Sequence, residues 1–367
     1  MKKNNLKLLF IILLVFLMTG CTKILKNEDN QVVKYDSSII CENCSSNCEE
    51  LQSQYDELSA IEEKTEDEIT EMSILETKIS TCTTECEAKC ESAKENETEQ
   101  NLTSNILCKP TNSDVIEIYE LYGVDIDSLP SCDNFDAFSS YEGLWISVFV
   151  RPLAWLILKV GDFLNNYGLS LVLISILIRV ALMPVTKKTA MQSENLKKAQ
   201  PEIDRINKKY EGKTDKDSNM QKSQETLVVY KKYNINPLSS CLFALIQIPL
   251  LFAFIEAINR TPAIFEGKFL GLRLGLTPWA ALKSGQWWYI IIVLILAVVT
   301  YFSLNLNKTA NMAGSDTEKQ MSIMNKVMIV FITFASFSLS TAICVYWISS
   351  SVFTVFQNLI VKKANNK

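Results

Sequence analysis

The amino-acid sequence predicts an all-α polytopic membrane protein with five transmembrane helices. Of its 367 residues, 48% are hydrophobic, and apolar runs of about 20 residues recur after residue 168, each long enough to cross a hydrocarbon core of about 30 Å. Residues 22–143 hold 8 basic and 29 acidic residues, a net charge of −21, whereas residues 187–235 hold 12 basic and 7 acidic residues, a net charge of +5. Basic loops stay on the cytoplasmic side, so the two segments are expected on opposite sides of a membrane.

Residues 1–20 have the pattern of a secretory signal peptide that ends before a cysteine. Three lysines precede an apolar stretch of 11 residues, 8–18, which is too short for a comfortable span. The small residues Thr19 and Gly20 then precede Cys21, as in the lipobox of lipoproteins. We expect Cys21 to be lipidated and to form a mature N-terminus outside the cytoplasm; the alternative is an uncleaved signal anchor.

Residues 21–143 form an acidic, cysteine-rich extracytoplasmic region that contains a helical hairpin. Its cysteines besides Cys21 include two triplets, 41/44/48 and 82/86/90, and each triplet lies along one helix face. Residues 49–81 contain no Gly or Pro and favour helix, with a reversal near residues 64–66. An antiparallel ladder gives the disulfides Cys41–Cys90, Cys44–Cys86 and Cys48–Cys82, with Cys108–Cys132 separate. Eight cysteines allow 105 pairings, and zinc is the rival explanation, disfavoured in an oxidising location.

Residues 144–166 are predicted to be an amphipathic helix at the outer membrane interface, with Trp145 and Trp155 at headgroup level. If this segment crossed the membrane, the basic residues of 187–235 would lie outside, against the charge rule. The membrane core is residues 168–361, and the tail 362–367 carries three lysines and is expected in the cytoplasm. The expected spans are 168–186, 237–258, 287–306, 324–339 and 342–361.

Between the first two spans, residues 187–235 are predicted to form a cytoplasmic helical hairpin. The apolar face of its first helix consists of Leu196, Ala199, Ile203, Ile206 and Tyr210. The turn is expected at residues 211–215, and the second helix at about 219–233, before Pro237.

The residue with the clearest chemical meaning is Arg179, which lies inside the first apolar run. Lys187 marks the cytoplasmic end of that run about 12 Å further on, so the guanidinium is costly to hold there, by at least about 2.5 kcal/mol. Within the five expected spans the only acidic residue is Glu256, near an outer end. Arg179 is therefore expected either in a hydrated cavity open to one side or, as the structural alternative, bonded to backbone carbonyls.

Three segments resemble the motifs of the YidC insertases and their Oxa and Albino relatives. They are residues 177–188 (LIRVALMPVTKK), residues 236–241 (NPLSSC) with 245–253 (LIQIPLLFA), and residues 345–357 (VYWISSSVFTVFQ). The segments occur in the family's order, on the expected spans, and the basic hairpin lies between the first two. The resemblance covers about 145–361 and says nothing of 22–143. Residues 339–342 (LSTA) depart from the Pro-Ala-Gly usual in the family.

The resemblance implies that Arg179 lies in a polar groove of the inner leaflet and attracts acidic or polar parts of a substrate's hydrophilic tail. Gln247 and Trp347 match positions that line the groove. Ser175 lies where the family often has Thr, and Tyr346 is expected beside the path of the substrate. A buried amide at Gln247 and packing aromatics at 346 and 347 are the structural alternatives.

The function expected from these features is a membrane protein insertase and chaperone that works Sec-independently or with the Sec translocon. Expected partners are nascent membrane proteins, the lipid bilayer, and the ribosome or targeting factors, with no sequence-specific nucleic acid. The chain has no His and no Gly-rich phosphate loop, so we expect no enzyme activity, metal or cofactor. The location expected is the bacterial plasma membrane. The alternative is a transporter or channel with Arg179 as an anion site, which predicts repeated span motifs.

Overall fold

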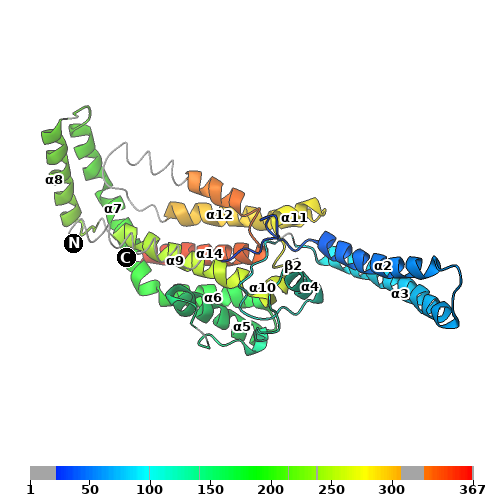
Figure 1. Cartoon of the computed structure of the whole chain (residues 1–367). Coiled ribbons are helices and arrows are strands. Elements are labelled where there is room, and N and C mark those ends of the chain that lie inside the picture. The colour runs from blue at the N-terminus through cyan, green and yellow to red at the C-terminus, as the bar shows by residue number, and fades with distance from the viewer. Residues whose placement is uncertain are drawn as a thin grey trace. The chain divides into compact units, whose positions relative to one another are not determined.

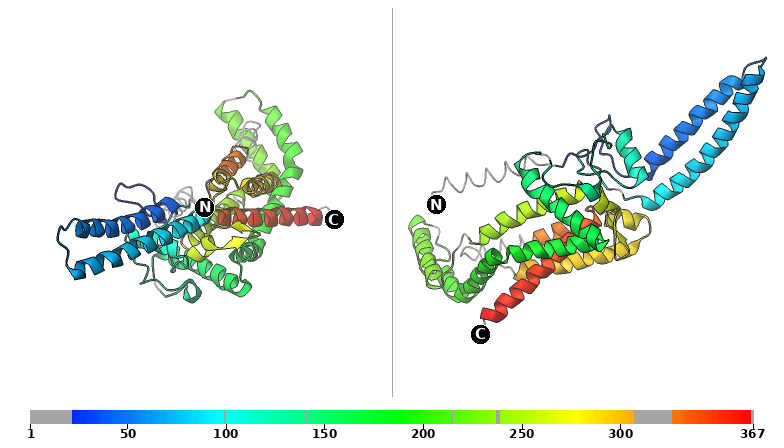
Figure 2. Two further views of the ribbon diagram at one scale, coloured as in Figure 1. Left: turned by 90° about the vertical axis from the view of Figure 1, so that its right-hand side faces the viewer. Right: turned by 90° about the horizontal axis from the view of Figure 1, so that it is seen from below.

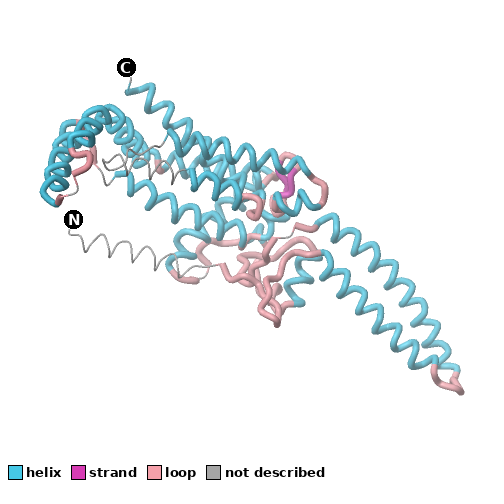
Figure 3. The backbone as a smooth tube through the Cα atoms, turned by 90° about the horizontal axis from the view of Figure 1, so that it is seen from above, coloured by secondary structure: helices cyan, strands magenta, loops and turns pink. Residues whose placement is uncertain are grey.

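The computed structural model describes residues 22–98, 100–139, 141–213, 215–236, 239–306 and 326–365. It divides into two compact units, residues 22–135 and, among the described residues, 136–365. Helices dominate both, and the only paired strands named within the described residues are the short hairpin drawn in magenta in Figure 3.

The unit of residues 22–135 contains a long antiparallel helical hairpin, α2 (Ser37–Ser59) and α3 (Glu66–Asn96) (Figure 1). Asp36 caps α2 by accepting a hydrogen bond from the backbone N–H of Ser38 at 2.9 Å. Thr65 caps α3 in a capping box with Glu68, and the hydrogen bonds from the Thr65 backbone and hydroxyl lower the pKa of the Glu68 carboxyl. The reversal lies between Ser59 and Glu66, where the sequence predicted it.

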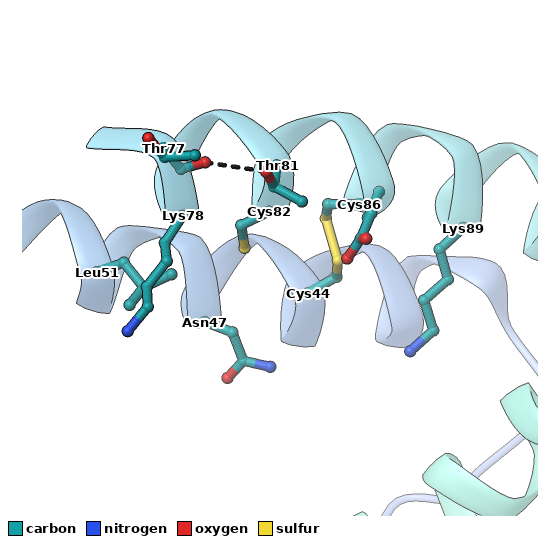
Figure 4. Close-up of a pocket in the computed structure, with 10 residues that line it drawn as sticks. Cys44, Asn47, Leu51, Thr77, Lys78, Thr81, Cys82, Cys86 and Lys89 are labelled. Carbon is teal, nitrogen blue, oxygen red and sulfur yellow. Dashed lines mark hydrogen bonds between the residues drawn. A yellow bond between two sulfur atoms is a disulfide. The ribbon is translucent and has the colours of Figure 1, made fainter. Parts of the chain in front are cut away.

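The cysteines of the hairpin lie in the order that the ladder predicts. The structure places the sulfur atoms of Cys41 and Cys90, of Cys44 and Cys86, and of Cys48 and Cys82 at bonding distance, with Cα–Cα distances of 5.0, 5.6 and 5.8 Å. Cys108 and Cys132 meet in the same way, with a Cα–Cα distance of 4.9 Å. Figure 4 shows the middle pair beside a cavity of about 440 Å³ between the two helices, with Asn47, Lys78 and Lys89 at its rim.

The rest of this unit is a small core of short elements. It consists of α4 (Ser113–Leu121), the single turn η1 (Cys132–Asn134) and isolated bridges such as Ile24–Thr103 and Lys34–Asn101. Ile118 of α4 is fully buried, and Glu117 forms an ion pair with Lys89 of α3. These contacts join α4 to the base of the hairpin.

The unit of residues 136–365 is a bundle of apolar helices. It contains the π-helical turn η2 (Ile146–Val150), α5 (Arg151–Leu164), α6 (Tyr167–Ala181), α9 (Ser239–Asn259), η3 (Trp287–Tyr289), α12 (Ile290–Leu306), a helix at Lys326–Ala335 and α14 (Thr341–Asn365). Helix α14 packs against α6, α9 and α12, and α5 packs against α6 and α9. Figures 1 and 2 show α12 and α14 lying side by side. The central helix of the bundle is therefore the last one in the chain.

Among the described residues, two segments are long and apolar enough to span a membrane, Trp287–Leu304 and Thr341–Ile360. The apolar helices Tyr167–Ala181, Pro249–Asn259 and Lys326–Ala335 are shorter. Each of the five expected spans thus contains an apolar helix, while the count of five crossings stays a prediction. The described chain turns between Ala335 and Thr341, where the sequence predicted the break of the final hairpin.

The first apolar run is divided at Leu182. Helix α6 ends at Ala181, and α7 (Met183–Lys209) begins with Pro184 in its first turn. Proline lacks the N–H that a continuous helix needs at this point, and it is well accommodated at a helix start. The span expected at 168–186 therefore consists of α6 plus the first residues of α7.

Helices α7 and α8 (Lys216–Lys232) form the hairpin predicted at 187–235. Leu196, Ala199 and Ile203 of α7 pack against Val229 and Tyr230 of α8, with Ile206 partly buried beside them. Gly212 takes a positive φ of 78° in the turn. Asp215 caps α8 by accepting from the Ser218 N–H at 2.8 Å, which is why α8 begins three residues before the predicted start.

Residues 260–289, for which the sequence predicted no element before 287, form a compact cap. They contain α10 (Pro262–Glu266), the antiparallel strands β1 (Lys268–Phe269) and β2 (Leu272–Arg273), and α11 (Pro278–Lys283). Phe269 lies directly against Gly168, where a Cβ would be only 2.3 Å from its side chain. Thr341 begins α14 and donates its hydroxyl to the Leu276 carbonyl at 2.7 Å. The residues LSTA at 339–342 thus anchor the start of α14 to the cap.

An ion network of two buried arginines and one partly exposed glutamate holds the start of this unit. Arg151 and Arg260, both less than 5% exposed, donate to the two oxygens of Glu142 at 2.8 and 2.7 Å. Arg151 also donates to the carbonyls of Asp136 and Ala137. The residues from 136 on therefore belong with the helix bundle, which starts eight residues before the predicted start at 144.

Trp145 is buried within the protein, while its predicted place at headgroup level stays a prediction. Its side chain is only 5% exposed, and the indole N–H donates to the Glu256 carboxylate at 3.1 Å. Glu256, the acidic residue found within the expected spans, thus has a polar partner on the segment that precedes α5. A buried indole needs such an acceptor, which is why Trp145 turns inward.

Candidate functional site around Arg179

Arg179 lies in the last turn of α6 and faces α14. Its side chain is 6% exposed, and its Nε donates to the Ser350 hydroxyl at 2.9 Å while an Nη of the same guanidinium donates to the same oxygen. Among the described residues, no carboxylate lies within ion-pair distance of this guanidinium. Within the part of the chain that the structure describes, Arg179 is therefore held by a neutral hydroxyl, rather than by a carboxylate or by the backbone carbonyls of the structural alternative.

Tyr346 lies one helical turn before Ser350 and belongs to the same cluster. Its side chain is 1% exposed, and its hydroxyl lies within electrostatic reach of Arg179 and close to Ser350. The Tyr346 ring stacks on Phe254 of α9, with ring centroids 3.9 Å apart. This stack fixes the face of α14 that Arg179 meets.

Ser175 lies one turn before Arg179 on α6 and is 1% exposed. Its hydroxyl donates to the Leu171 carbonyl of its own helix at 2.5 Å, so in this state it is bonded within α6 and not to the guanidinium. Ser175 therefore lies on the Arg179 side of the helix without contacting Arg179 through its hydroxyl.

Trp347 contacts α12, whereas Tyr346 contacts α9. Its indole N–H donates to the Thr300 hydroxyl of α12 at 3.1 Å, and its ring packs beside Leu296 and Ile292. Consecutive residues of an α-helix point about 100° apart, so a helix that turns Tyr346 toward α9 turns Trp347 toward α12. The structure thus places these two aromatic residues on different faces of α14.

A second polar contact joins the same two chain segments. Gln357 of α14 is 8% exposed and donates from Nε2 to the Thr186 hydroxyl of α7 at 2.7 Å. Thr186 follows Arg179 by seven residues, and Gln357 follows Ser350 by seven residues. Two side-chain contacts, seven residues apart on each side, therefore connect the continuous segment α6–α7 to α14.

Two other predicted positions have a limited structural description. Gln247 lies on α9, but its side chain lies outside the described side chains, and Cys21 lies outside the described residues altogether. Among the described residues no cluster of metal-binding side chains occurs. Cys344 is buried in α14 with its thiol near the Ser336 carbonyl, as a packing residue would be.

Sequence reasoning missed Ser350, Thr186 and Gln357. The available signal was weak: residues 349–351 are three consecutive serines, and small hydroxyl residues bond to their own backbone in many helices. Gln357 carried a clearer signal, since an amide inside an apolar span needs a polar partner.

Comparison with known proteins identifies the family. The family model described as 60Kd inner membrane protein matches residues 159–367, more than half of the chain. The chain belongs to the YidC/Oxa1 family. The match begins inside α5, so it contains every residue of the Arg179 cluster and none of the unit at 22–135.

Curated relatives agree with this assignment. The membrane protein insertase YidC of Oceanobacillus iheyensis is 33% identical over 228 residues, 60% of this chain and 85% of the relative. YidC 2 of Listeria innocua is 33% identical over 220 residues, 60% of this chain and 72% of the relative. The insertase MisCA of Bacillus subtilis is 32% identical over 219 residues, 59% and 79% of the two chains. The predicted resemblance is confirmed.

Proposed function

We propose that this chain inserts integral membrane proteins into the bacterial plasma membrane and assists their folding. The observation that carries the proposal is the charge of Arg179, buried in an apolar bundle and held by the Ser350 hydroxyl instead of a carboxylate. Burying a guanidinium in this way is costly, and such a residue in a membrane segment is a functional site by default. Relatives that carry the insertase name support the same conclusion.

In the proposed mechanism, Arg179 attracts acidic or polar parts of the hydrophilic tail of a nascent membrane protein in a hydrated groove open to the cytoplasm. Arg179, Ser350 and Tyr346 form the core of this site. We assign Gln247 to its lining, and Trp347 to the adjoining face of α14 that meets α12. The substrate's own apolar helix supplies the driving force, at about 25 cal/mol for each Å² removed from water. No nucleotide is needed, and the chain works alone or with the Sec translocon.

The topology that goes with this mechanism has five crossings, at 168–186, 237–258, 287–306, 324–339 and 342–361. The lipid on Cys21 and the acidic residues 21–143 lie outside, α5 lies at the outer interface, and the α7–α8 hairpin and the tail lie in the cytoplasm. The charges of −21 and +5 on the two polar segments support this orientation. The basic hairpin is the surface we assign to ribosomes or targeting factors.

The test is complementation of a bacterium depleted of its own insertase. The full chain is expected to restore growth and the insertion of small membrane proteins. Arg179→Lys is expected to retain more activity than Arg179→Ala or Arg179→Glu, at matched protein levels in the membrane. Equal growth of all three variants would remove Arg179 from the mechanism. Failure of a well-expressed wild-type chain would reject the insertase function itself.

A further inference from the structure

The Ser350 hydroxyl is neutral, yet it accepts two hydrogen bonds from a charged group. One oxygen accepts from both Nε and an Nη of Arg179, and Ser350 itself is only 3% exposed. A carboxylate in the same position would accept two parallel hydrogen bonds and neutralise the charge, and charge-assisted bonds are about twice as strong as neutral ones. The partner that Arg179 has in this state is therefore weaker than the partner that its geometry can accept.

The surroundings keep Ser350 in place. Tyr346, one turn before it, is held by its stack on Phe254, and Gln357, two turns after it, is bonded to Thr186. These contacts fix the position of α14 against α9 before Ser350 and against α7 after it. The hydroxyl is presented to the guanidinium by contacts that do not depend on Arg179.

We propose that Ser350 is the resting partner of Arg179, which a carboxylate of the arriving polypeptide displaces. The proposal rests on the proposed function and names the regulation of the same site. While no substrate is bound, the hydroxyl satisfies two guanidinium donors and holds the side chain against α14. An acidic side chain of the substrate offers two charged oxygens, so the exchange of partners is favourable, and release returns the guanidinium to Ser350.

This arrangement explains why a hydroxyl is suited to position 350. A carboxylate there would neutralise Arg179 permanently and compete with the substrate. An apolar residue would leave two guanidinium donors without an acceptor in the resting state, which is costly in a buried site. A serine lies between these extremes because its bond is sufficient for the resting state and is readily replaced.

The first experiment measures insertion by full-length protein in liposomes, using small membrane proteins whose translocated tails carry either acidic or neutral side chains. Ser350→Asp is compared with Ser350→Asn, which has nearly the same size and no charge. We expect Ser350→Asp to lower insertion of the acidic-tail substrate at least tenfold relative to Ser350→Asn, with a much smaller difference for the neutral-tail substrate. Equal insertion of the acidic-tail substrate by the two variants would overturn the proposal.

A second measurement does not depend on insertion. Arginine-selective modification of Arg179 by phenylglyoxal is followed by mass spectrometry in the full-length protein. Ser350→Ala is expected to raise the modification rate at least threefold, and Ser350→Thr, which restores a hydroxyl, is expected to keep it near the wild-type rate. Unchanged reactivity in Ser350→Ala would contradict the resting contact. A wild-type chain that protects Arg179 through Ser350 and yet inserts nothing would instead reject the proposed function.

Discussion

The hairpin α2–α3 and the helix pair α6–α14 show two different ways of holding helices together. Along α2 and α3 most side chains are exposed, and three cysteine pairs join the helices where apolar contacts are few. On the faces of α14 that meet α6 and α7 the joining groups are buried and polar: Arg179 of α6 donates to Ser350, and Gln357 donates to Thr186 of α7. We therefore expect the α2–α3 hairpin to depend on covalent links, and the unit that matches the family to depend on packing plus buried polar contacts.

The largest effect is expected from removing the cysteine links. A disulfide typically stabilises by about 2–4 kcal/mol, and a two-helix hairpin with little apolar core has few other sources of stability. Reduction of the purified chain is expected to abolish hydrogen-exchange protection in α2 and α3. Peptides of α6 and α14 serve as the internal control and are expected to keep their protection. Peptide mapping of the oxidised chain should recover the four predicted pairs, and undiminished protection after complete reduction would show that the hairpin stands without them.

The next effect concerns the packed hairpin α7–α8, which has an apolar seam and no cysteine. Ile203 is 1% exposed in that seam, and truncation of a buried isoleucine to alanine costs about 2–5 kcal/mol. Ile203→Ala is expected to increase exchange throughout α7 and α8 while α12 and α14 are unaffected. The matched control is Val228→Ala on the exposed face of α8, where the side chain is 66% exposed. Similar behaviour of the two variants would show that the seam does not hold this hairpin.

A smaller effect is expected at the ion network of Glu142, Arg151 and Arg260. Removing one member of a fully buried pair costs about 3–5 kcal/mol, but the Glu142 side chain is 36% exposed and part of its charge is screened. Glu142→Gln is therefore expected to destabilise the unit by about 1–3 kcal/mol, measured as a lower midpoint of thermal unfolding in detergent. Glu211→Gln in the exposed turn of the α7–α8 hairpin is the control and is expected to change nothing.

The smallest effect is the pH dependence of the same network. Burial raises the pKa of the Glu142 carboxyl, but the hydrogen bonds and charges of Arg260 and Arg151 lower it by more, so the pKa in the folded chain lies below the ordinary value of about 4.3. The network therefore contributes fully above the ordinary pKa and loses its contribution as the pH falls through the lowered one. Wild-type stability should fall more steeply below pH 4.3 than that of Glu142→Gln. Parallel curves would show that Glu142 is not the titrating group.

Much of the fold follows from patterns in the sequence. The ladder of cysteine pairs follows from helix periodicity and a nearly constant sum of positions, and the apolar face at 196, 199 and 203 follows from the same periodicity. Helix α6 ends earlier than the predicted span because Pro184 follows it, and α8 begins earlier than predicted because Asp215 caps it. Local backbone chemistry sets helix ends more precisely than hydrophobicity does. The cap of α10, β1, β2 and α11 was missed because its elements are only two to six residues long.

The candidate site was predictable only in part. Arg179 was identified from its cost, since a charge in an apolar run is rare and informative. Its partner was not, because a serine in an apolar helix is common and bonds equally well to its own backbone, as Ser175 does. Which face of α14 meets α6 depends on the packing of Tyr346 on Phe254, which lies about 90 residues away in sequence. Motifs therefore identified the residues, and only packing identified which of them touch.

The central claim is that insertion depends on the unit of residues 136–365 and not on that of residues 22–135. Its most direct test compares two strains of the same insertase-depleted bacterium. One strain carries the chain without residues 30–135, and the other carries the full chain with Arg179→Ala, at equal amounts in the membrane. The account predicts that the deletion restores growth and membrane protein insertion close to the level of the intact chain, whereas Arg179→Ala loses most of both. Loss of insertion in the deletion strain, with insertion retained in Arg179→Ala, would contradict it.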